Sequence, residues 1–240
     1  MAELDALLEV VRVLAPLPLV LRGGLAMRLA VQPAERPVDD VDVLSDEPME
    51  VARERVRGAL VGVRSEEVIW AETATPGVRW QLDGGVQVDL GFGDPRPLPD
   101  VRRVYPGTDV EVTLVAPEVH WAWKVHGLFE RGRGKWRPKD LWDLWLLQEN
   151  ARLDRSLLGE CVRVAFETPG DPLVETTARF REGDWGETRG SQRKWRHHFL
   201  KRRGWAEAPD FFAVREAVRE WLGAAVGAAS ETPTPPPEEG

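Results

Sequence analysis

Residues 36–44 read Arg-Pro-Val-Asp-Asp-Val-Asp-Val-Leu, and the alternation of acidic and apolar residues in this segment constrains the rest of the chain. We expect a strand over Val38–Leu44, because side chains along a strand point alternately to its two faces. Asp40 and Asp42 then project from one face, about 7 Å apart. Two neighbouring carboxylates repel each other unless a cation lies between them. Mg²⁺ suits this position, because it binds one or two carboxylates together with substrate phosphates. The alternative is a solvent-exposed face of an edge strand.

A third carboxylate, Asp89, lies in the predicted strand Gly85–Phe92. Asp83-Gly84-Gly85 is a typical hairpin turn that joins this strand to Gly77–Leu82, and a further strand is predicted over Val63–Trp70. If the strand of Asp89 pairs beside the acidic strand, three carboxylates meet on one patch. Phosphoryl transfer with two metal ions about 3.5–4 Å apart needs such a patch. The alternative for Asp89 is simple exposure.

Gly23-Gly24 separates a buried strand, Leu19–Leu21, from a helix predicted over Leu25–Val31. A glycine turn at this point lets backbone N–H groups and a helix N-terminus face a phosphate. Alone, this glycine pair indicates only a turn. It becomes a candidate phosphate-binding turn because Gly24 lies 16 residues before Asp40 of the acidic strand. The P-loop and Gly-x-Gly-x-x-Gly patterns are absent, which argues against a P-loop NTPase and a dinucleotide-binding fold.

The order of predicted elements indicates an α+β protein. Helical stripes cover Leu4–Leu14 and Met49–Leu60, a last short strand is expected over Val110–Val115, and only helices are expected after Pro117. We therefore expect a mixed-sheet lobe over residues 1–115, a helical lobe over 116–228, and a Pro- and Glu-rich disordered tail over 229–240.

Composition excludes several classes of protein. The 240 residues are 42% apolar and carry a net charge of −8, and no window approaches the roughly 18 apolar residues that span a membrane. The N-terminus is acidic where an export signal starts with basic residues. Cys161 is the only cysteine, so neither an internal disulfide nor a cysteine-based zinc cluster can form. We expect a cytoplasmic protein with no membrane partner.

Lys124 lies on a predicted helix, on the same face as Trp121 and Leu128. Apolar neighbours aim its ammonium group in one direction, which suits a fixed positive charge for a triphosphate. The alternative is a lysine whose stem packs at a seam between two helices while its charge reaches solvent.

The next helix begins with Arg137-Pro-Lys-Asp140-Leu-Trp-Asp143. Pro138 fits the first helical position, which places Asp140 in the first turn. One alternative for Asp140 is therefore a plain capping role. Asp140 also shares a stripe with Leu144 and Leu147, which turns it inward. There it could be a salt-bridge partner of Lys124 or a general base for an attacking hydroxyl. We favour a general base or an acid on the metal side.

Charge is distributed unevenly, with acidic residues early and basic residues late. Residues 179–203 carry 9 Lys and Arg against 3 Asp and Glu. The basic segments Arg131–Lys139 and Arg189–Arg203 suit an RNA held by its phosphates, although scattered arginines on solvated helices would look the same. Three tryptophans among these charges either stack on bases or belong to the core: Trp136, Trp195 and Trp205.

Four segments of the sequence together resemble one family of proteins. In chain order these segments are Gly23-Gly24-Leu-Ala, Arg36 with Asp40-Val-Asp42, Lys124, and Arg137-Pro-Lys-Asp140-Leu-Trp-Asp143. In this order they are similar to the AbiEii/AbiGii-type nucleotidyltransferase toxins, which include the MenT toxins. That family is a branch of the polymerase-β-like nucleotidyltransferase superfamily. The Arg-x-Lys-Asp-x-x-Asp helix start is its most specific motif, and the resemblance covers residues 17–150.

The resemblance implies roles for individual residues. Asp40 and Asp42 would bind Mg²⁺, Gly23 and Gly24 would hold nucleotide phosphates, and Asp140 would be essential in the helical lobe. Arg36 and Lys124 would contact the nucleotide. Members of the family often have Thr or Ser where this chain has Val38, so any regulation through a hydroxyl at that position is in doubt here.

We therefore expect a two-lobed, Mg²⁺-dependent nucleotidyltransferase in which an NTP binds between the lobes. An acceptor hydroxyl attacks the α-phosphate, and the acceptor is an RNA such as the tRNA acceptor end. The resemblance implies a toxin with a cognate antitoxin as partner. Two other hypotheses stay open. One is a small-molecule nucleotidyltransferase of the antibiotic-modifying kind, and the other is a catalytically silent nucleotide- or RNA-binding module.

Overall fold

The computed structural model describes residues 4–30, 38–69, 76–105, 108–132, 135–200 and 209–231. Contacts within the chain divide it into two compact units, Met1–His120 and Trp121–Gly240. The expected boundary at residue 115 lies five residues before this division.

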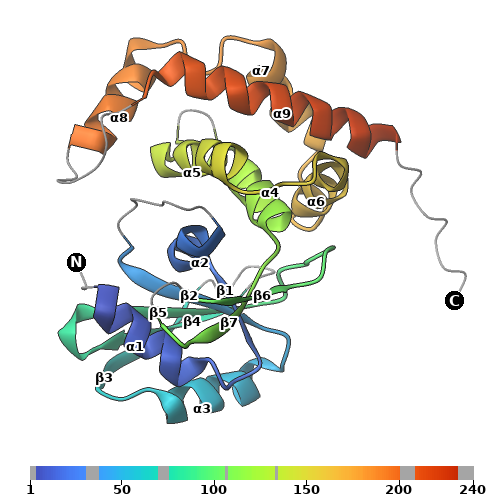
Figure 1. Ribbon diagram of the computed structural model, residues 1–240. Coiled ribbons are helices and arrows are strands. Elements are labelled where there is room, and N and C mark those ends of the chain that lie inside the picture. The colour runs from blue at the N-terminus through green and yellow to red at the C-terminus, as the bar shows by residue number, and fades with distance from the viewer. Residues whose placement is uncertain are drawn as a thin grey trace, which may run out of the picture. The chain divides into compact units, whose positions relative to one another are not determined.

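The first unit is built on a seven-stranded mixed sheet with the strand order β3-β4-β5-β2-β1-β7-β6 (Figure 1). Its helices are α1 (Leu4–Leu14), α2 (Gly23–Ala30) and α3 (Met49–Ala59), and a short 3₁₀ helix covers Asp83–Gly85. The strands are β1 (Leu19–Arg22), β2 (Asp40–Ser45), β3 (Val63–Ile69), β4 (Gly77–Leu82), β5 (Gln87–Phe92), β6 (Val101–Val104) and β7 (Glu111–Leu114). The α+β class and the mixed sheet are confirmed.

The core of this unit lies on one face of the sheet. Val41 and Val43 of β2 belong to one apolar cluster with Leu7 and Val11 of α1 and Val56 of α3. Burial of large apolar side chains such as these contributes about 1.5–3 kcal/mol each. Because strand side chains alternate, the other face of β2 carries the two aspartates. The core on one face therefore fixes which way the acids point.

The second unit consists of helices: α5 (Pro138–Asn150), α6 (Arg155–Glu167), α7 (Leu173–Glu182), α8 (Arg189–Leu200) and α9 (Phe211–Glu231), with most of α4 (Pro117–Gly127). Aromatic side chains fill much of its interior. Trp136 and Trp195 are 3% and 1% exposed. Of the two roles considered for them, the core role is confirmed, and Trp205 lies outside the described residues. None of the described helices is both long and apolar enough to cross a membrane.

The structure differs from the predicted elements at three places. Strand β6 was not predicted, because Val-Arg-Arg-Val is short and lies at the sheet edge, where only one side needs a partner. Helix α2 begins at Gly23, so the glycine pair opens the helix and does not precede it. Helix α9 continues to Glu231, into the segment 229–240 predicted to be disordered, because its alanine-rich end favours a helix.

Gly159 of α6 packs directly against α9. A Cβ at this position would lie 2.9 Å from Ala228 Cβ and 3.0 Å from the backbone nitrogen of Ala229. Gly159→Ala is therefore expected to push the helices apart and destabilise the helical unit by about 1–3 kcal/mol in urea denaturation. Gly223→Ala is the matched control, because a Cβ there meets open space. It should be neutral or stabilising by up to about 1 kcal/mol, and equal effects at both positions would contradict the packing argument.

Candidate active site

Polar side chains form a row on the face of the sheet opposite the apolar side chains Val41 and Val43. The strand register aligns Arg22 of β1, Asp42 of β2, Asp89 of β5 and Arg79 of β4. Paired residues on neighbouring strands share a face, so these four side chains project to the same side. The condition set for Asp89 is met, because its strand pairs beside the acidic strand, in parallel, with Asp42 beside Asp89 and Asp40 beside Gln87.

Asp89 is held by Arg79 in a bidentate ion pair. The Nε and Nη2 atoms of Arg79 donate to its two carboxylate oxygens at 2.8 and 2.7 Å, and Gln87 donates to Oδ2 at 3.1 Å. Asp89 is only 3% exposed. No group of three or more His, Cys, Asp or Glu within the described ranges could hold a metal ion, and the role of Asp89 as a third metal ligand stays a prediction. The guanidinium of Arg79 already compensates the charge of Asp89, which weakens that prediction.

Arg22 lies on the other side of Asp42 but pairs elsewhere. Its guanidinium binds Asp94, in a pair whose side chains are both 17% exposed. To reach Asp94 it passes over Gly91, where a Cβ would lie 2.8 Å from Arg22 Nη2. Burial raises the pKa of Asp94, and the charge of Arg22 opposes this shift. The nearest cation of the row is therefore directed away from Asp42.

Asp42 lies against the glycine turn. Gly23 has a φ of +65°, and a Cβ there would lie 1.8 Å from Asp42 Oδ2. The half-buried carboxylate of Asp42 makes no hydrogen bond or ion pair with any described residue. Glycine is needed here for two reasons, its left-handed backbone and the close approach of the acid. The close approach of the acid depends on contacts that the sequence alone does not show.

A divalent cation fits this donor set. Asp40 and Asp42 are both half-buried and lie on the same face of β2, two residues apart. Oxygen donors alone suit Mg²⁺, which takes its remaining ligands from water and substrate phosphates. Arg36, which the resemblance places at the nucleotide, lies outside the described residues. Gly24 is buried within the first turn of α2, and its contact with a phosphate stays a prediction.

Substituting Gly23 tests the close approach. Gly23→Ala is expected to displace the Asp42 carboxylate and to abolish any function that depends on it. Gly84→Ala is the matched control, because Gly84 has a φ of +75° and a Cβ there meets open space. Both variants should lose about 1–2 kcal/mol of stability through backbone strain. Only the first should lose Mn²⁺ binding, measured by calorimetric titration, and a similar loss in both would refute the contact.

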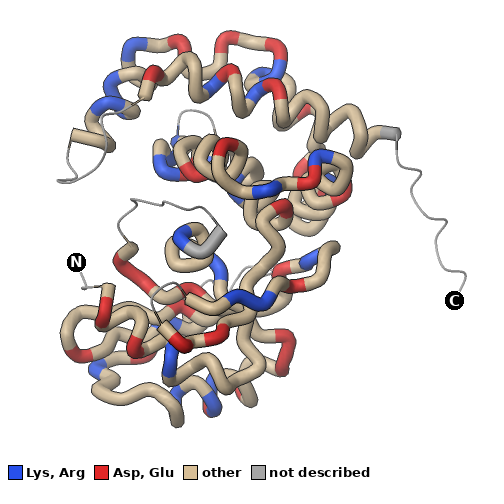
Figure 2. The backbone as a smooth tube through the Cα atoms, viewed as in Figure 1, with Lys and Arg blue, Asp and Glu red and all other residues tan. Residues whose placement is uncertain are grey.

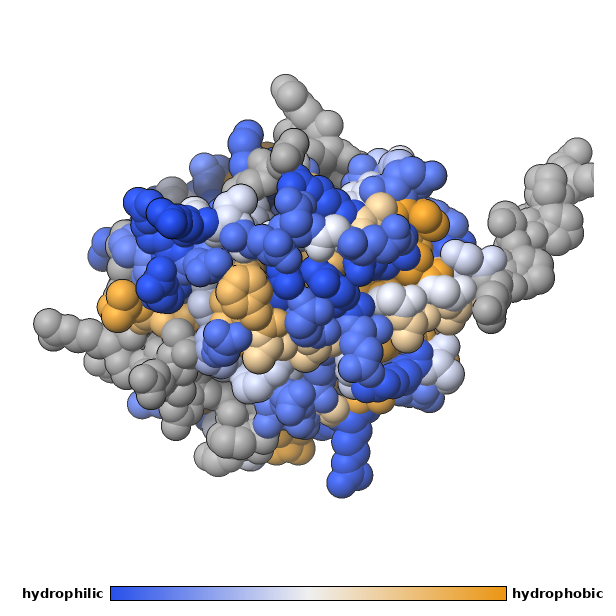
Figure 3. Space-filling model, turned by 90° about the horizontal axis from the view of Figure 1, so that it is seen from above, coloured by the Kyte–Doolittle hydropathy of each residue, from blue (hydrophilic) through white to orange (hydrophobic). Residues whose placement is uncertain are grey.

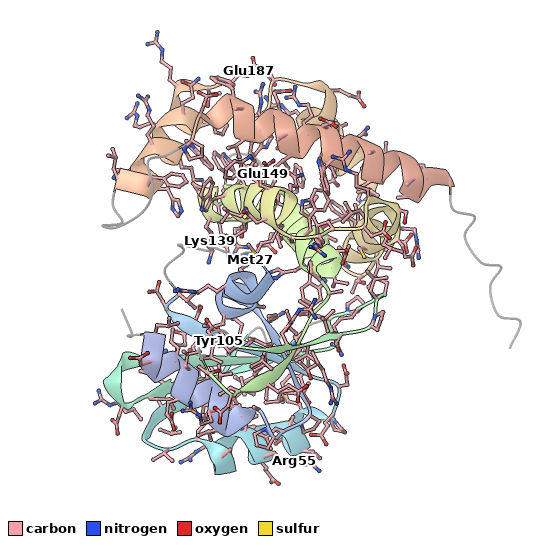
Figure 4. All side chains as sticks on the ribbon, in the orientation of Figure 1. Met27, Arg55, Tyr105, Lys139, Glu149 and Glu187 are labelled. Atoms are coloured by element: carbon pink, nitrogen blue, oxygen red, sulfur yellow. The ribbon has the colours of Figure 1, made fainter. Side chains whose placement is uncertain are left out.

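A second charged cluster lies in the helical unit. Lys124 of α4 contacts Asp140 at 3.2 Å and Asp143 at 3.0 Å, and Arg137 also binds Asp140. Both aspartates are 0% exposed and Lys124 is 14% exposed. Both lie on α5, whose ends Lys139 and Glu149 mark in Figure 4. The salt bridge between Lys124 and Asp140, one of the alternatives for that acid, is confirmed.

The electrostatics of this cluster bear on the two roles predicted for it. Burial raises the pKa of Asp140, but the charges of Lys124 and Arg137 outweigh burial and leave the pKa below its usual range. A carboxylate with a lowered pKa and no exposure is a weak proton acceptor, which disfavours Asp140 as a general base. Lys124 likewise balances two buried acids. The cluster thus holds α4 and α5 together, and its roles in catalysis stay predictions.

The lowered pKa of Asp140 gives a pH prediction. The stabilisation is complete above the ordinary pKa of about 3.9 and is lost as the pH falls through the lower pKa of the folded state. Asp140→Asn should therefore be markedly less stable than the wild type at pH 7. The difference should shrink below about pH 4. Urea denaturation at pH 7, 4 and 2.5 checks this, and a difference independent of pH would contradict the ionised pair.

The chain is similar to one protein family and to several solved structures. A family described as "Nucleotidyl transferase AbiEii toxin, Type IV TA system" matches residues 5–229. No curated protein matches the chain. Among solved structures, JHP933 from Helicobacter pylori is 15% identical, with a TM-score of 0.46 over 94% of this chain and 91% of its own. A protein described as a candidate nucleotidyltransferase, also from H. pylori, is 15% identical with a TM-score of 0.46, over 94% and 93% of the two chains.

Proposed function

We propose that this chain, which belongs to the AbiEii family of nucleotidyl transferase toxins, transfers a nucleoside monophosphate from an NTP to an RNA hydroxyl. Mg²⁺ is the proposed cofactor. One observation carries the metal assignment. Asp42 lies near Asp40 on the same face of β2, against Gly23, and no described residue compensates its charge. Its neighbours in the row are matched elsewhere, Asp89 with Arg79 and Arg22 with Asp94.

In this proposal each residue of the first unit has a defined task. Asp40 and Asp42 hold Mg²⁺, which neutralises charge on the triphosphate and on the departing pyrophosphate. The N-terminus of α2, at Gly23 and Gly24, offers backbone N–H groups to phosphate oxygens. Arg79 fixes the position of Asp89 by a bidentate contact, so that β5 supports β2 without adding a metal ligand. Asp89 is thus a positioning residue.

The reaction balances without any further reactant. The acceptor oxygen forms a bond to the α-phosphorus of the NTP, the bond from that phosphorus to the bridging oxygen breaks, and pyrophosphate leaves. The hydroxyl proton passes to water. An RNA acceptor is supported by charge, because residues 179–203 carry 9 basic against 3 acidic residues. The toxin–antitoxin character of the family supports a cognate antitoxin as partner, and the proposed place of action is the cytoplasm.

Label transfer tests this function. The protein is incubated with Mg²⁺, total RNA and each NTP in turn, labelled with ³²P at the α- or the γ-phosphate. We expect label on RNA from at least one α-labelled NTP, none from its γ-labelled form, and none with EDTA. Label from the γ-phosphate would indicate a kinase and overturn the proposal. In a parallel reaction, aminoglycosides replace RNA as the acceptor. Label found only on the aminoglycosides would support the small-molecule alternative.

A further inference from the structure

Helix α8 presents an exposed basic stripe. Arg189, Arg193 and Arg196 follow one another at about one turn and are all exposed. Positive charges therefore recur about every 5 Å along the helix. No Asp or Glu occurs in α8. Figure 2 shows the basic residues on this helix, and Figure 3 shows the mostly hydrophilic face to which it belongs.

These three arginines differ from most others of the helical unit. Among the described residues they form no ion pair, whereas an acid binds each of the following: Arg131, Arg137, Arg155, Arg163, Arg179, Arg181, Arg215 and Arg219. A carboxylate beside an arginine offsets the positive charge that would attract a phosphate. The other predicted basic segment, 131–139, is thus poorly suited to the task, because its described arginines are already paired.

The opposite side of α8 is anchored in the aromatic core. Trp195 packs on Phe199 at 4.8 Å and on Phe211 at 5.8 Å between ring centroids, and Phe199 packs on Trp142 at 5.2 Å. The indole of Trp195 donates to the carbonyl of Pro209 at 3.0 Å. The arginines therefore project from a helix whose position is fixed, so little ordering of the backbone is needed when a ligand binds.

A groove accompanies the stripe. It has a volume of about 450 Å³ and is lined by Gly190, Arg193, Lys194 and His197. Lys194 lies 5.2 Å from the ring centroid of Trp136, which holds its ammonium group in place. This shallow surface is lined by an arginine, a lysine and a histidine, with no acid among its lining residues, so its charge favours an anion.

We propose that α8 binds the phosphate backbone of an RNA chain through Arg189, Arg193 and Arg196, with the groove beside them taking one phosphate. This deepens the proposed function and rests on it for the role of the bound RNA as acceptor. Guanidinium groups bind phosphate oxygens in pairs, and a repeat of about one helical turn suits successive contacts along a polyanion. An acidic protein is the weaker candidate, because protein interfaces have an apolar or aromatic centre, whereas Leu200 is the one large exposed apolar residue recorded on α8.

Binding without chemistry tests this surface. Fluorescence anisotropy follows a fluorescein-labelled tRNA transcript with the full chain, without NTP or divalent metal, at 50, 100 and 200 mM KCl. The test variant is Arg189→Gln/Arg193→Gln/Arg196→Gln. The matched control is Arg152→Gln/Arg155→Gln/Arg179→Gln, which removes three exposed charges of the same unit outside α8. Circular dichroism confirms that both are folded.

We expect the Kd of the α8 variant to rise by at least about 10-fold at 100 mM KCl, and the slope of log K against log salt to become shallower by about 2–3. The control should stay within about 3-fold of the wild type. Equal losses in both variants, or no loss in the α8 variant, would overturn the proposal. A labelled poly-glutamate peptide that binds the wild type as tightly as RNA would also overturn it.

The same assay separates this inference from the proposed function. Asp42→Asn should bind RNA like the wild type, because α8 does not carry the proposed metal ligands. If the wild type binds RNA through α8 but transfers no label from any NTP, the proposed function fails and the surface stands. If label transfer occurs and the α8 variant binds and transfers normally, the surface alone is refuted.

Discussion

Lys124→Met is expected to destabilise the helical unit by about 3–5 kcal/mol, because it leaves buried carboxylates without their cation. The ammonium group of Lys124 lies 3.2 Å from Asp140 and 3.0 Å from Asp143, and neither acid is exposed. Arg137 can compensate only Asp140. A unit of this size should lose roughly 10–20 °C of its melting temperature. Thermal denaturation followed by tryptophan fluorescence reports mainly on this unit, which contains most of the tryptophans.

The double variant Lys124→Met/Asp143→Asn is the control for this prediction. It removes one positive and one negative charge together, so it should recover about 1–3 kcal/mol relative to the single variant. A single variant as stable as the wild type would show that the buried acids do not need the lysine. A double variant no more stable than the single would show that Asp143 is not the acid left uncompensated.

Asp42→Asn is expected to reduce label transfer by roughly 10³-fold, because a bound metal supplies several kcal/mol of transition-state stabilisation and each 1.4 kcal/mol is tenfold. Asn keeps the shape of the side chain and removes its charge, so the fold should be unaffected. Asp39→Asn is the matched control, because Asp39 is the exposed neighbour just before β2. It should transfer label at the wild-type rate. Transfer by Asp42→Asn at that rate would remove the proposed metal site.

Local pattern was sufficient to predict much of the first unit. The alternation in Asp40–Leu44 indicated a strand with both acids on one face. Strand β2 has this form because Val41 and Val43 are buried in the apolar core on the other face. The glycine pair indicated where β1 ends and α2 begins, although the pair itself forms the start of the helix. In each case the deciding information lies within a few residues of the chain.

Pairing between distant segments was harder to predict. Arg79 and Asp89 are ten residues apart, and their bidentate contact depends on the register of β4 against β5. Sequence alone left Asp89 available for a metal, because nothing near it in the chain shows its arginine. The inward turn of Asp140 was visible in the helical stripe, but the second acid on Lys124 was not assigned. Ion pairs between residues far apart in the sequence can be recognised only when the fold is known.

The proposed mechanism requires Asp40 and Asp42 to hold one divalent ion together, so metal binding is the decisive measurement. Electron paramagnetic resonance can measure the binding of Mn²⁺ to the wild type, Asp40→Asn, Asp42→Asn and Asp39→Asn, each with a non-hydrolysable NTP analogue. We predict one ion per chain for the wild type and Asp39→Asn, and affinity at least about 10-fold weaker for the other two. Unchanged Mn²⁺ affinity in Asp40→Asn and Asp42→Asn would contradict the account.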